Sequence, residues 1–190
     1  MRTTSMMIVG VGGQGTLLSS RLLGSVLMRR GFDVKVSEVH GMSQRGGSVV
    51  TYVKYGEEVH SPVVELGEAD IIIAFELLEA ARYLPYLKKG GTMVVNTQQI
   101  DPMPVIIGAK EYPEGLLDSI KSAEVHVLAA DALSLALEAG SAKAVNLVLL
   151  GAVARFMDFE ESEWLDAVKE TVPPKFLDLN IKAFKLGIQI

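Results

Sequence analysis

The sequence contains no cysteine. This absence excludes disulfides, thiol catalysis, cysteine-based zinc sites and iron–sulfur clusters held by the chain's own thiolates. Any iron–sulfur centre that the function requires must therefore sit in another chain. Positive charge is also scarce, because 18 Lys and Arg face 23 Asp and Glu, for a formal net charge of −5. Proteins that bind nucleic acid usually carry a clustered basic surface, so we expect no nucleic-acid partner.

Long apolar runs are missing as well. The run around residues 147–154 is far shorter than the roughly 20 residues of a membrane span. The N-terminus shows no charged-then-apolar segment followed by a small-residue cleavage site. We therefore expect a cytoplasmic protein with no membrane partner.

Histidine is rare, and its positions give a metal site little support. His40, His60 and His126 fall in separate segments, without the i, i+4 pairing of a helical metal site. Of the three, only His40 lies in a segment that the motifs below single out. Ser43 has no G-x-S-x-G elbow around it, so hydrolase chemistry is disfavoured.

What the sequence does contain is an alternation of short β-branched runs with longer helical patterns, which is typical of an α/β sheet built from crossover units. We predict one domain over residues 1–190, a three-layer α/β/α fold with a mostly parallel, Rossmann-like sheet and a helical C-terminal third. Strands are expected at residues 6–10, 34–39, 49–55, 70–75, 92–96 and 125–129, with 49–55 returning through 59–61 as a hairpin. Helices are expected at residues 14–30, 77–87, 133–139 and 144–157, then from a capping box of Asp158 and Glu161, and finally from 173 towards 186.

A glycine-rich turn joins the first strand to the first helix. Residues 10–15 read Gly-Val-Gly-Gly-Gln-Gly and satisfy G-x-G-x-x-G in the strand–turn–helix setting that gives this pattern its meaning. Glycines there allow backbone N–H groups to approach an anion at the positive end of the helix. One candidate is a phosphate-bearing ligand or the rim of a cofactor. Another is a dinucleotide, with Glu38 at the end of the second strand available for ribose hydroxyls. The alternative is that the turn needs glycines only for close packing.

A second polar, glycine-rich loop follows the second strand at residues 40–48. Ligands of open α/β sheets gather at the carboxyl ends of the strands, where this loop should lie. Arg45 offers a permanent charge in a fork that suits carboxylate or phosphate; alternatively it pairs with Glu38 or Glu57. We expect this loop and the glycine turn to lie side by side, because the two strands should be parallel neighbours.

Together the two loops resemble the gamma-domain family of 2-oxoacid:ferredoxin (acceptor) oxidoreductases. The resemblance rests on Gly-Val-Gly-Gly-Gln-Gly at 10–15 and Ser-Gln-Arg-Gly-Gly-Ser at 43–48, with further matches at 67–76, 143–151 and 180–187. Residues 38–47 are most similar to the indolepyruvate-oxidising members. The resemblance covers essentially the whole chain.

The resemblance implies a non-redox subunit of a thiamine diphosphate-dependent enzyme that oxidatively decarboxylates indolepyruvate or another arylpyruvate to an acyl-CoA. Thiamine diphosphate, Mg and [4Fe–4S] clusters would belong to a partner alpha subunit, coenzyme A would be the co-substrate, and ferredoxin would take the electrons through the complex. This chain has no Gly-Asp-Gly followed by Asn-Asn, the usual thiamine diphosphate and metal signature, so it should be inactive alone and bind no cofactor itself. No catalytic residue and no metal ligand is assigned. The predicted ligand-facing edge consists of Gly12, Gly13, Gln14, Gly15, Thr16, Ser43, Gln44, Arg45, Gly46 and Gly47.

Two other functions stay open on the residues alone. One is a stand-alone NAD- or FAD-binding Rossmann oxidoreductase that uses the glycine turn. The other is a nucleotide- or anion-sensing module without an enzymatic partner.

Overall fold

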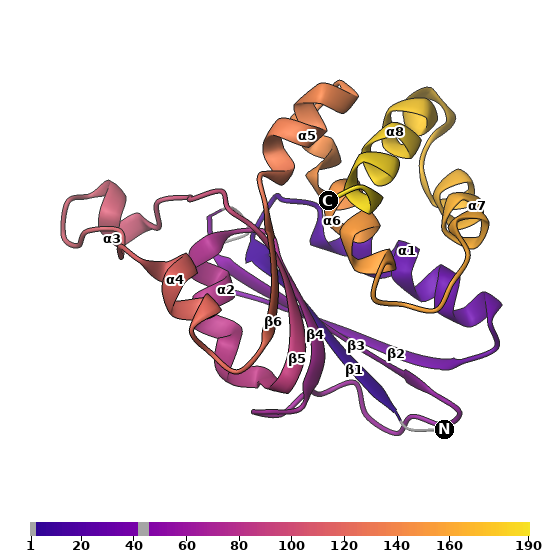
Figure 1. Ribbon diagram of the computed structural model, residues 1–190, viewed down its shortest axis with the longest axis horizontal. Helices are drawn as coiled ribbons and strands as arrows, with labels where there is room; N and C mark the ends of the chain where they lie inside the picture. The colour runs from indigo at the N-terminus through magenta and orange to yellow at the C-terminus, as the bar shows by residue number, and fades with distance from the viewer. Residues whose placement is uncertain (1–2, 42–45) are drawn as a thin grey trace.

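The computed structural model describes residues 3–41 and 46–190 and places their strands in one sheet between two layers of helices (Figure 1). The strands are β1 (Thr4–Val11), β2 (Asp33–His40), β3 (Ser48–Gly56), β4 (Ala69–Ala74), β5 (Leu87–Asn96) and β6 (His126–Ala130). On one face lie α1 (Thr16–Arg29), α5 (Ala132–Ala139), α6 (Val145–Ala154), α7 (Glu161–Thr171) and α8 (Leu177–Ile188). On the other lie α2 (Leu77–Tyr83) and α4 (Leu116–Lys121), with α3 (Met103–Ile106) projecting from the body. The predicted α/β/α fold with a helical C-terminal third is confirmed.

The sheet has the strand order β2-β3-β1-β4-β5-β6. The neighbouring strands β1, β4, β5 and β6 are parallel to one another. Strand β3 is antiparallel to both of its neighbours, β1 and β2. All strands except β3 therefore point the same way, and the mostly parallel sheet is confirmed. The expectation that the first two strands are neighbours is wrong, because β3 turns back from β2 and inserts between β2 and β1.

The central strand β1 explains where the two cores sit. Alternate side chains of a strand point to opposite faces, so Met6 and Ile8 pack under α1 and α6, while Met7 and Val9 pack under α2. All four side chains are fully buried. A strand covered on both faces reads as a continuous apolar run, as β1 does.

Helix α6 is apolar apart from Asn146, and each of its residues from 145 to 153 is buried. It packs most closely on α8, where Gly151 and Gly187 bring the two backbones together. A Cβ at Gly151 would overlap the Phe184 carbonyl oxygen and lie 3.0 Å from the Gly187 Cα. Glycine is thus required at this crossing. In the part of the chain that the structure describes, no helix is long and apolar enough to cross a membrane.

Several predicted boundaries are wrong, for local reasons. The helix expected to reach residue 87 ends at Tyr83, and the 3-10 turn η1 (Leu84–Tyr86) contains Pro85, which cannot donate a helical hydrogen bond. Strand β5 accordingly begins at Leu87, before the expected residue 92.

The expected return strand at 59–61 is not formed. The Val59 N–H instead donates to the Asp33 carboxylate at 2.8 Å. The capping box of α7 is also shifted by two residues: Glu160 is the N-cap, and its N–H donates to the Glu163 carboxylate at 2.9 Å. Two further 3-10 turns, η2 (Ala142–Ala144) and η3 (Pro174–Phe176), precede α6 and α8.

Glu163 also ties α7 to the end of α1, which predicts a pH effect. Arg30 donates to both of its carboxylate oxygens, at 2.5 and 2.6 Å. That guanidinium, helped by the Glu160 N–H, lowers the pKa of Glu163 from 4.5 to about 2. A depressed pKa means that the stabilisation is present above pH 4.5 and is lost as the pH falls towards 2. We expect Glu163→Gln, which can keep the capping box but not the ion pair, to be less stable than wild type at neutral pH.

The difference between the two proteins should shrink steadily as the pH falls from 4.5 towards 2. Urea unfolding at a series of pH values measures it. A difference that stays constant across this range would contradict the assignment.

Candidate functional site

The glycine turn lies at the carboxyl end of β1 and leads into α1. Gly13 and Gly15 have φ values of 103° and 87°, a left-handed conformation that side-chain-bearing residues rarely adopt. The Gly12 N–H donates to the Gly47 carbonyl at 2.9 Å, so the turn touches the end of the second loop. The expected side-by-side placement is confirmed for this contact. The reason given for it is wrong: β1 and β2 are not neighbours, and the antiparallel β3 is the strand that brings Gly47 to the turn.

Ser43, Gln44 and Arg45 were predicted to face a ligand, and they lie outside the described residues. Of the same loop, Gly46 lines a small polar cavity of about 60 Å³. The loop's described end is anchored by Ser48, the first residue of β3.

Gln14 occupies the inside of the turn. Its carboxamide oxygen accepts a hydrogen bond from the Val11 N–H at 2.7 Å, and its amide nitrogen donates to the Phe75 carbonyl at 3.1 Å. The side chain thereby links β1 to the end of β4 and fixes the shape of the turn. Gln14 was predicted to face a ligand, and in the structure both ends of its carboxamide are engaged within the protein.

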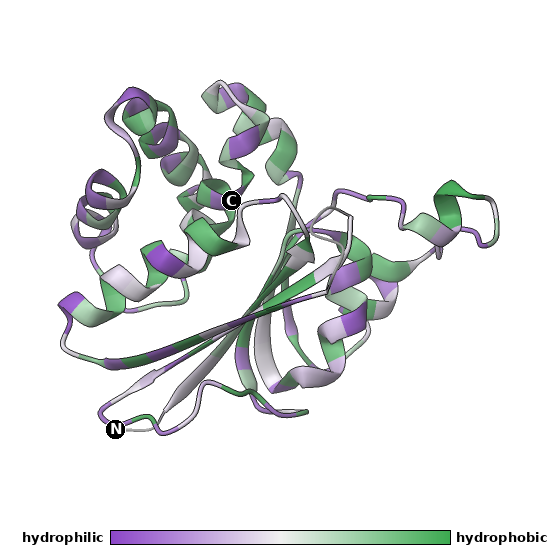
Figure 2. Ribbon diagram, turned by 180° about the vertical axis from the view of Figure 1, so that it is seen from behind, coloured by the Kyte–Doolittle hydropathy of each residue, from purple (hydrophilic) through white to green (hydrophobic). Residues whose placement is uncertain are grey.

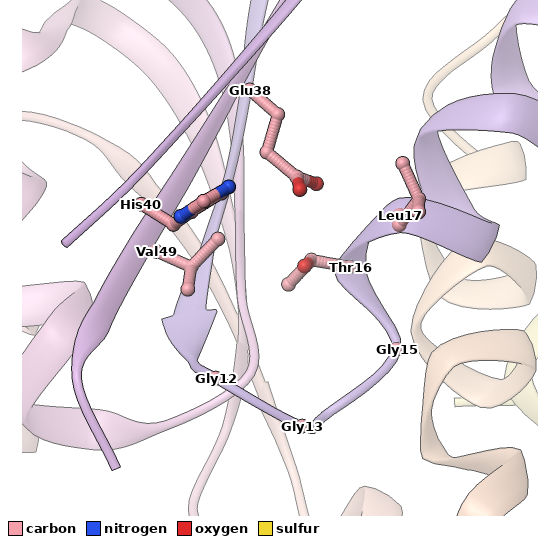
Figure 3. Close-up of a pocket in the computed structure, with 8 residues that line it drawn as sticks. All are labelled: Gly12, Gly13, Gly15, Thr16, Leu17, Glu38, His40 and Val49. Carbon is pink, nitrogen blue, oxygen red and sulfur yellow. The ribbon is translucent and has the colours of Figure 1, made fainter. Parts of the chain in front are cut away.

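Two cavities flank the glycine turn. The first, of about 390 Å³, opens between the turn and strands β2 and β3 (Figure 3). We call it the Glu38 cavity; Glu38 and Thr16 point into it from opposite sides, and His40 lies beside them. Thr16 is 7% exposed. The Glu38 carboxylate accepts a hydrogen bond from the Thr51 hydroxyl at 3.3 Å.

The second cavity, of about 430 Å³, lies on the other side of the turn. We call it the Lys143 cavity, after the residue of η2 at its rim. Its remaining walls come from the turn, from the segment after β5 and from α5 and α6. The residues that line it are Gly13, Gln14, Gly15, Leu18, Gln98, Ile100, Leu133, Ala142, Lys143, Val145 and Asn146.

Sequence reasoning missed most of this second cavity. Lys143 and Asn146 appeared only within the family-like segment at 143–151, with no ligand-binding role assigned to either. The available signal was the single amide in an otherwise apolar helix, since a buried polar side chain needs partners. Asn146 is 3% exposed and packs directly against Gly15.

A group of buried carboxylates lies beyond the loop, at the start of α2. Glu76 caps this helix by accepting the Glu79 N–H at 2.9 Å, and also accepts the Ile100 N–H at 3.0 Å and the Tyr112 hydroxyl. Glu76 thereby holds the base of the arm, which we define as residues 97–115 and which carries α3 at its apolar tip (Figure 2). Burial, together with the Glu76 carboxylate, raises the pKa of Tyr112.

Glu79 connects the same region to the second loop. Its carboxylate accepts a hydrogen bond from the Ser48 hydroxyl and lies 3.5 Å from Arg82. Burial raises the pKa of Glu79, although Ser48 and Arg82 oppose the shift. Within residues 3–41 and 46–190 no group of three or more His, Asp or Glu is placed to hold a metal ion.

Comparison with known proteins places this architecture among relatives. A family model described as pyruvate ferredoxin/flavodoxin oxidoreductase matches residues 5–190. The chain is 43% identical to indolepyruvate oxidoreductase subunit IorB of Thermococcus kodakarensis, over 100% of this chain and 96% of that one. It is 38% identical to the IorB subunit of Archaeoglobus fulgidus, over 96% and 92% of the two chains.

Two solved structures share the fold. The gamma subunit of a keto/oxoacid ferredoxin oxidoreductase from Geobacter sulfurreducens matches with a TM-score of 0.74 at 23% identity, over 98% of this chain and 96% of that one. The 2-oxoglutarate:ferredoxin oxidoreductase from Magnetococcus marinus, solved with 2-oxoglutarate, coenzyme A and succinyl-CoA bound, matches with a TM-score of 0.75 at 20% identity. This second match covers all of the present chain but 31% of the other, so the fold there forms part of a longer polypeptide.

Proposed function

Because the chain belongs to the pyruvate ferredoxin/flavodoxin oxidoreductase family, we propose that it works as a subunit of an indolepyruvate-type 2-oxoacid:ferredoxin oxidoreductase. The observation that carries the proposal is the full-length similarity, at 35–43% identity, to IorB subunits from four organisms. The complex would convert a 2-oxoacid and coenzyme A to an acyl-CoA, CO₂ and a proton. Two electrons would leave one at a time to two oxidised ferredoxins.

The chain's own residues do not fit the redox cofactors of such an enzyme. It has no thiolate for an iron–sulfur cluster and no Gly-Asp-Gly and Asn-Asn pattern for thiamine diphosphate with its metal. We therefore place thiamine diphosphate, Mg and the [4Fe–4S] clusters in a partner alpha subunit, which also delivers electrons to ferredoxin. The role left to this chain is binding and positioning.

The proposed ligand-facing edge is the glycine turn together with the loop at 43–47. Three observations support it. The glycine turn and Gly47, at the described end of the loop, lie beside the carboxyl end of β1, where ligands of α/β proteins collect. The contact between Gly12 and Gly47 joins them, and the start of α1 presents backbone N–H groups that suit an anion. An anionic group of coenzyme A or of the 2-oxoacid is the ligand that this chemistry favours.

The stand-alone NAD- or FAD-binding oxidoreductase is not favoured. The relatives that match over the full chain are named as subunits of oxoacid oxidoreductases. The sheet also departs from the dinucleotide pattern, because the antiparallel β3 separates β1 from β2.

Reconstitution tests the proposal. The purified chain should contain no iron and no thiamine diphosphate, and should not oxidise 2-oxoacids by itself. Mixed with the candidate alpha subunit, it should form a stable complex that reduces ferredoxin with indolepyruvate and coenzyme A. Arg45→Ala in that complex should raise a KM roughly tenfold to hundredfold, as expected for loss of a charge-assisted contact.

Three outcomes would count against these assignments. Acceptor reduction by the chain alone, or failure to assemble with any alpha subunit, would refute the subunit role. Unchanged KM values for both substrates in a complete Arg45→Ala complex would instead remove only this loop from the ligand site.

A further inference from the structure

The two cavities that share the glycine turn differ in charge. The Glu38 cavity is walled by a carboxylate and by no lysine or arginine among the described residues that line it. The Lys143 cavity is lined by one lysine and, in the described part of the chain, by no Asp or Glu. The glycine turn therefore lies between a cavity with an acidic residue and a cavity with a basic residue.

We infer that an anionic group of the ligand, other than the one assigned to Arg45, binds in the Lys143 cavity, with Lys143 supplying the charge and Asn146 a directed hydrogen bond. The inference rests on the proposed function and deepens it by assigning two binding residues. The ligand chemistry is a carboxylate or a phosphate, as carried by a 2-oxoacid or by coenzyme A.

Asn146 is the observation that points most directly to a ligand. Its side chain is almost completely buried, at 3% exposure. The amide oxygen is occupied, because it accepts the Leu147 N–H at 3.0 Å. The amide nitrogen finds no acceptor in residues 3–41 and 46–190 and lies 3.2 Å from where a Cβ of Gly15 would be. Two N–H donors are thus held, without an acceptor, against the turn at the cavity wall.

Lys143 complements this amide. It lies in the 3-10 turn η2, one residue before the buried Ala144 that precedes α6. Its ammonium group has no ion pair with any described residue. The apolar residues Leu133 and Val145 line the cavity beside Lys143, which is itself exposed at the rim. A lysine in this position attracts an anion without having to release an internal partner first.

The Glu38 cavity is the competing location, and its chemistry disfavours an anion. The Glu38 carboxylate points into it and is held there by Thr51. An anion that used the same backbone N–H groups from that side would meet this negative charge.

The test uses the assembled complex with indolepyruvate and coenzyme A as probes. Lys143→Met should raise the KM for one of them roughly tenfold to hundredfold, leave kcat nearly unchanged, and leave assembly intact. Lys143→Arg should restore most of the loss, because it returns the charge. A rise for coenzyme A alone identifies a phosphate as the bound group, and a rise for indolepyruvate alone identifies the carboxylate.

Matched variants separate this effect from others. Lys121→Met removes an exposed charge on α4, on the opposite face of the sheet, and should alter neither KM. Glu38→Gln should leave both values nearly unchanged if the anion binds beside Lys143. Unchanged KM values in Lys143→Met, or a lowered KM in Glu38→Gln alone, would overturn the inference. An inactive wild-type complex would instead reject the proposed function.

Discussion

Replacing Gly151 with alanine is expected to lower the free energy of unfolding by about 2–3 kcal/mol, although alanine is the better helix former. A Cβ there would overlap the Phe184 carbonyl oxygen and press on the backbone at Gly187. These are backbone atoms of α8, so no side-chain rotation relieves the overlap and the helices must separate. Separation would reopen the core around α6, whose residues 145–153 are all buried.

A second buried helical glycine provides a control for which the same substitution should raise the free energy of unfolding. Gly24 is also buried within a helix, α1, but a Cβ at that position would meet nothing within 4 Å. Gly24→Ala should therefore stabilise the protein by up to about 1 kcal/mol. Urea unfolding of both variants can be followed by the fluorescence of the single tryptophan, Trp164, whose ring lies 5.7 Å from that of Phe184. Equal stability of the two variants would refute the close-packing argument.

Glu76→Ala is expected to cost about 3 kcal/mol and to free the arm. The substitution removes the cap of α2 and the acceptor for the Ile100 N–H and the Tyr112 hydroxyl. Hydrogen bonds to a charged acceptor contribute about 1.5–3 kcal/mol each, and part of the loss is recovered when water reaches the released donors. The local consequence should be faster amide hydrogen exchange across residues 100–112, with little change in β1 and β4.

Tyr112→Phe provides the comparison for this second prediction. It removes one of the three hydrogen bonds and keeps the ring, so the loss should be about 1 kcal/mol and the exchange of the Ile100 amide should change little. If Glu76→Ala left exchange in the arm at the wild-type rate, Glu76 would not be what holds the arm.

The sequence was most informative where one local rule decides the structure. The apolar run of β1 and the glycines at 13 and 15 each reflect a nearby constraint: burial on both faces in one case and positive φ in the other. The contact of the glycine turn with Gly47 was predicted correctly, but the predicted reason, that β1 and β2 are neighbours, is wrong. An antiparallel strand inserted between β1 and β2 leaves no mark in either strand's own pattern.

The residues that pattern reasoning passed over depend on contacts between distant segments. Glu76 reads as an ordinary acidic residue after a strand, and only the fold shows that it collects donors from residues 79, 100 and 112. Lys143 likewise gains interest only because α6 brings Asn146 against Gly15. The box at Glu160 and Glu163 was misplaced because acidic residues at 158, 160, 161 and 163 offer several registers, and the pairing of Glu163 with Arg30 is visible only in three dimensions.

The position of β1 at the centre of the sheet has a consequence for how the chain acquires its structure. Thr4 pairs with Tyr55, and Met6 pairs with Ile71, so both partners of β1 are synthesised long after it. Until they arrive, four consecutive side chains that the native protein buries completely, from Met6 to Val9, remain open to water and to other nascent chains. Sheets closed by such distant pairings form slowly, and the waiting segment favours aggregation over folding as concentration rises. During synthesis, the nascent chain is therefore prone to aggregation until β4 has left the ribosome.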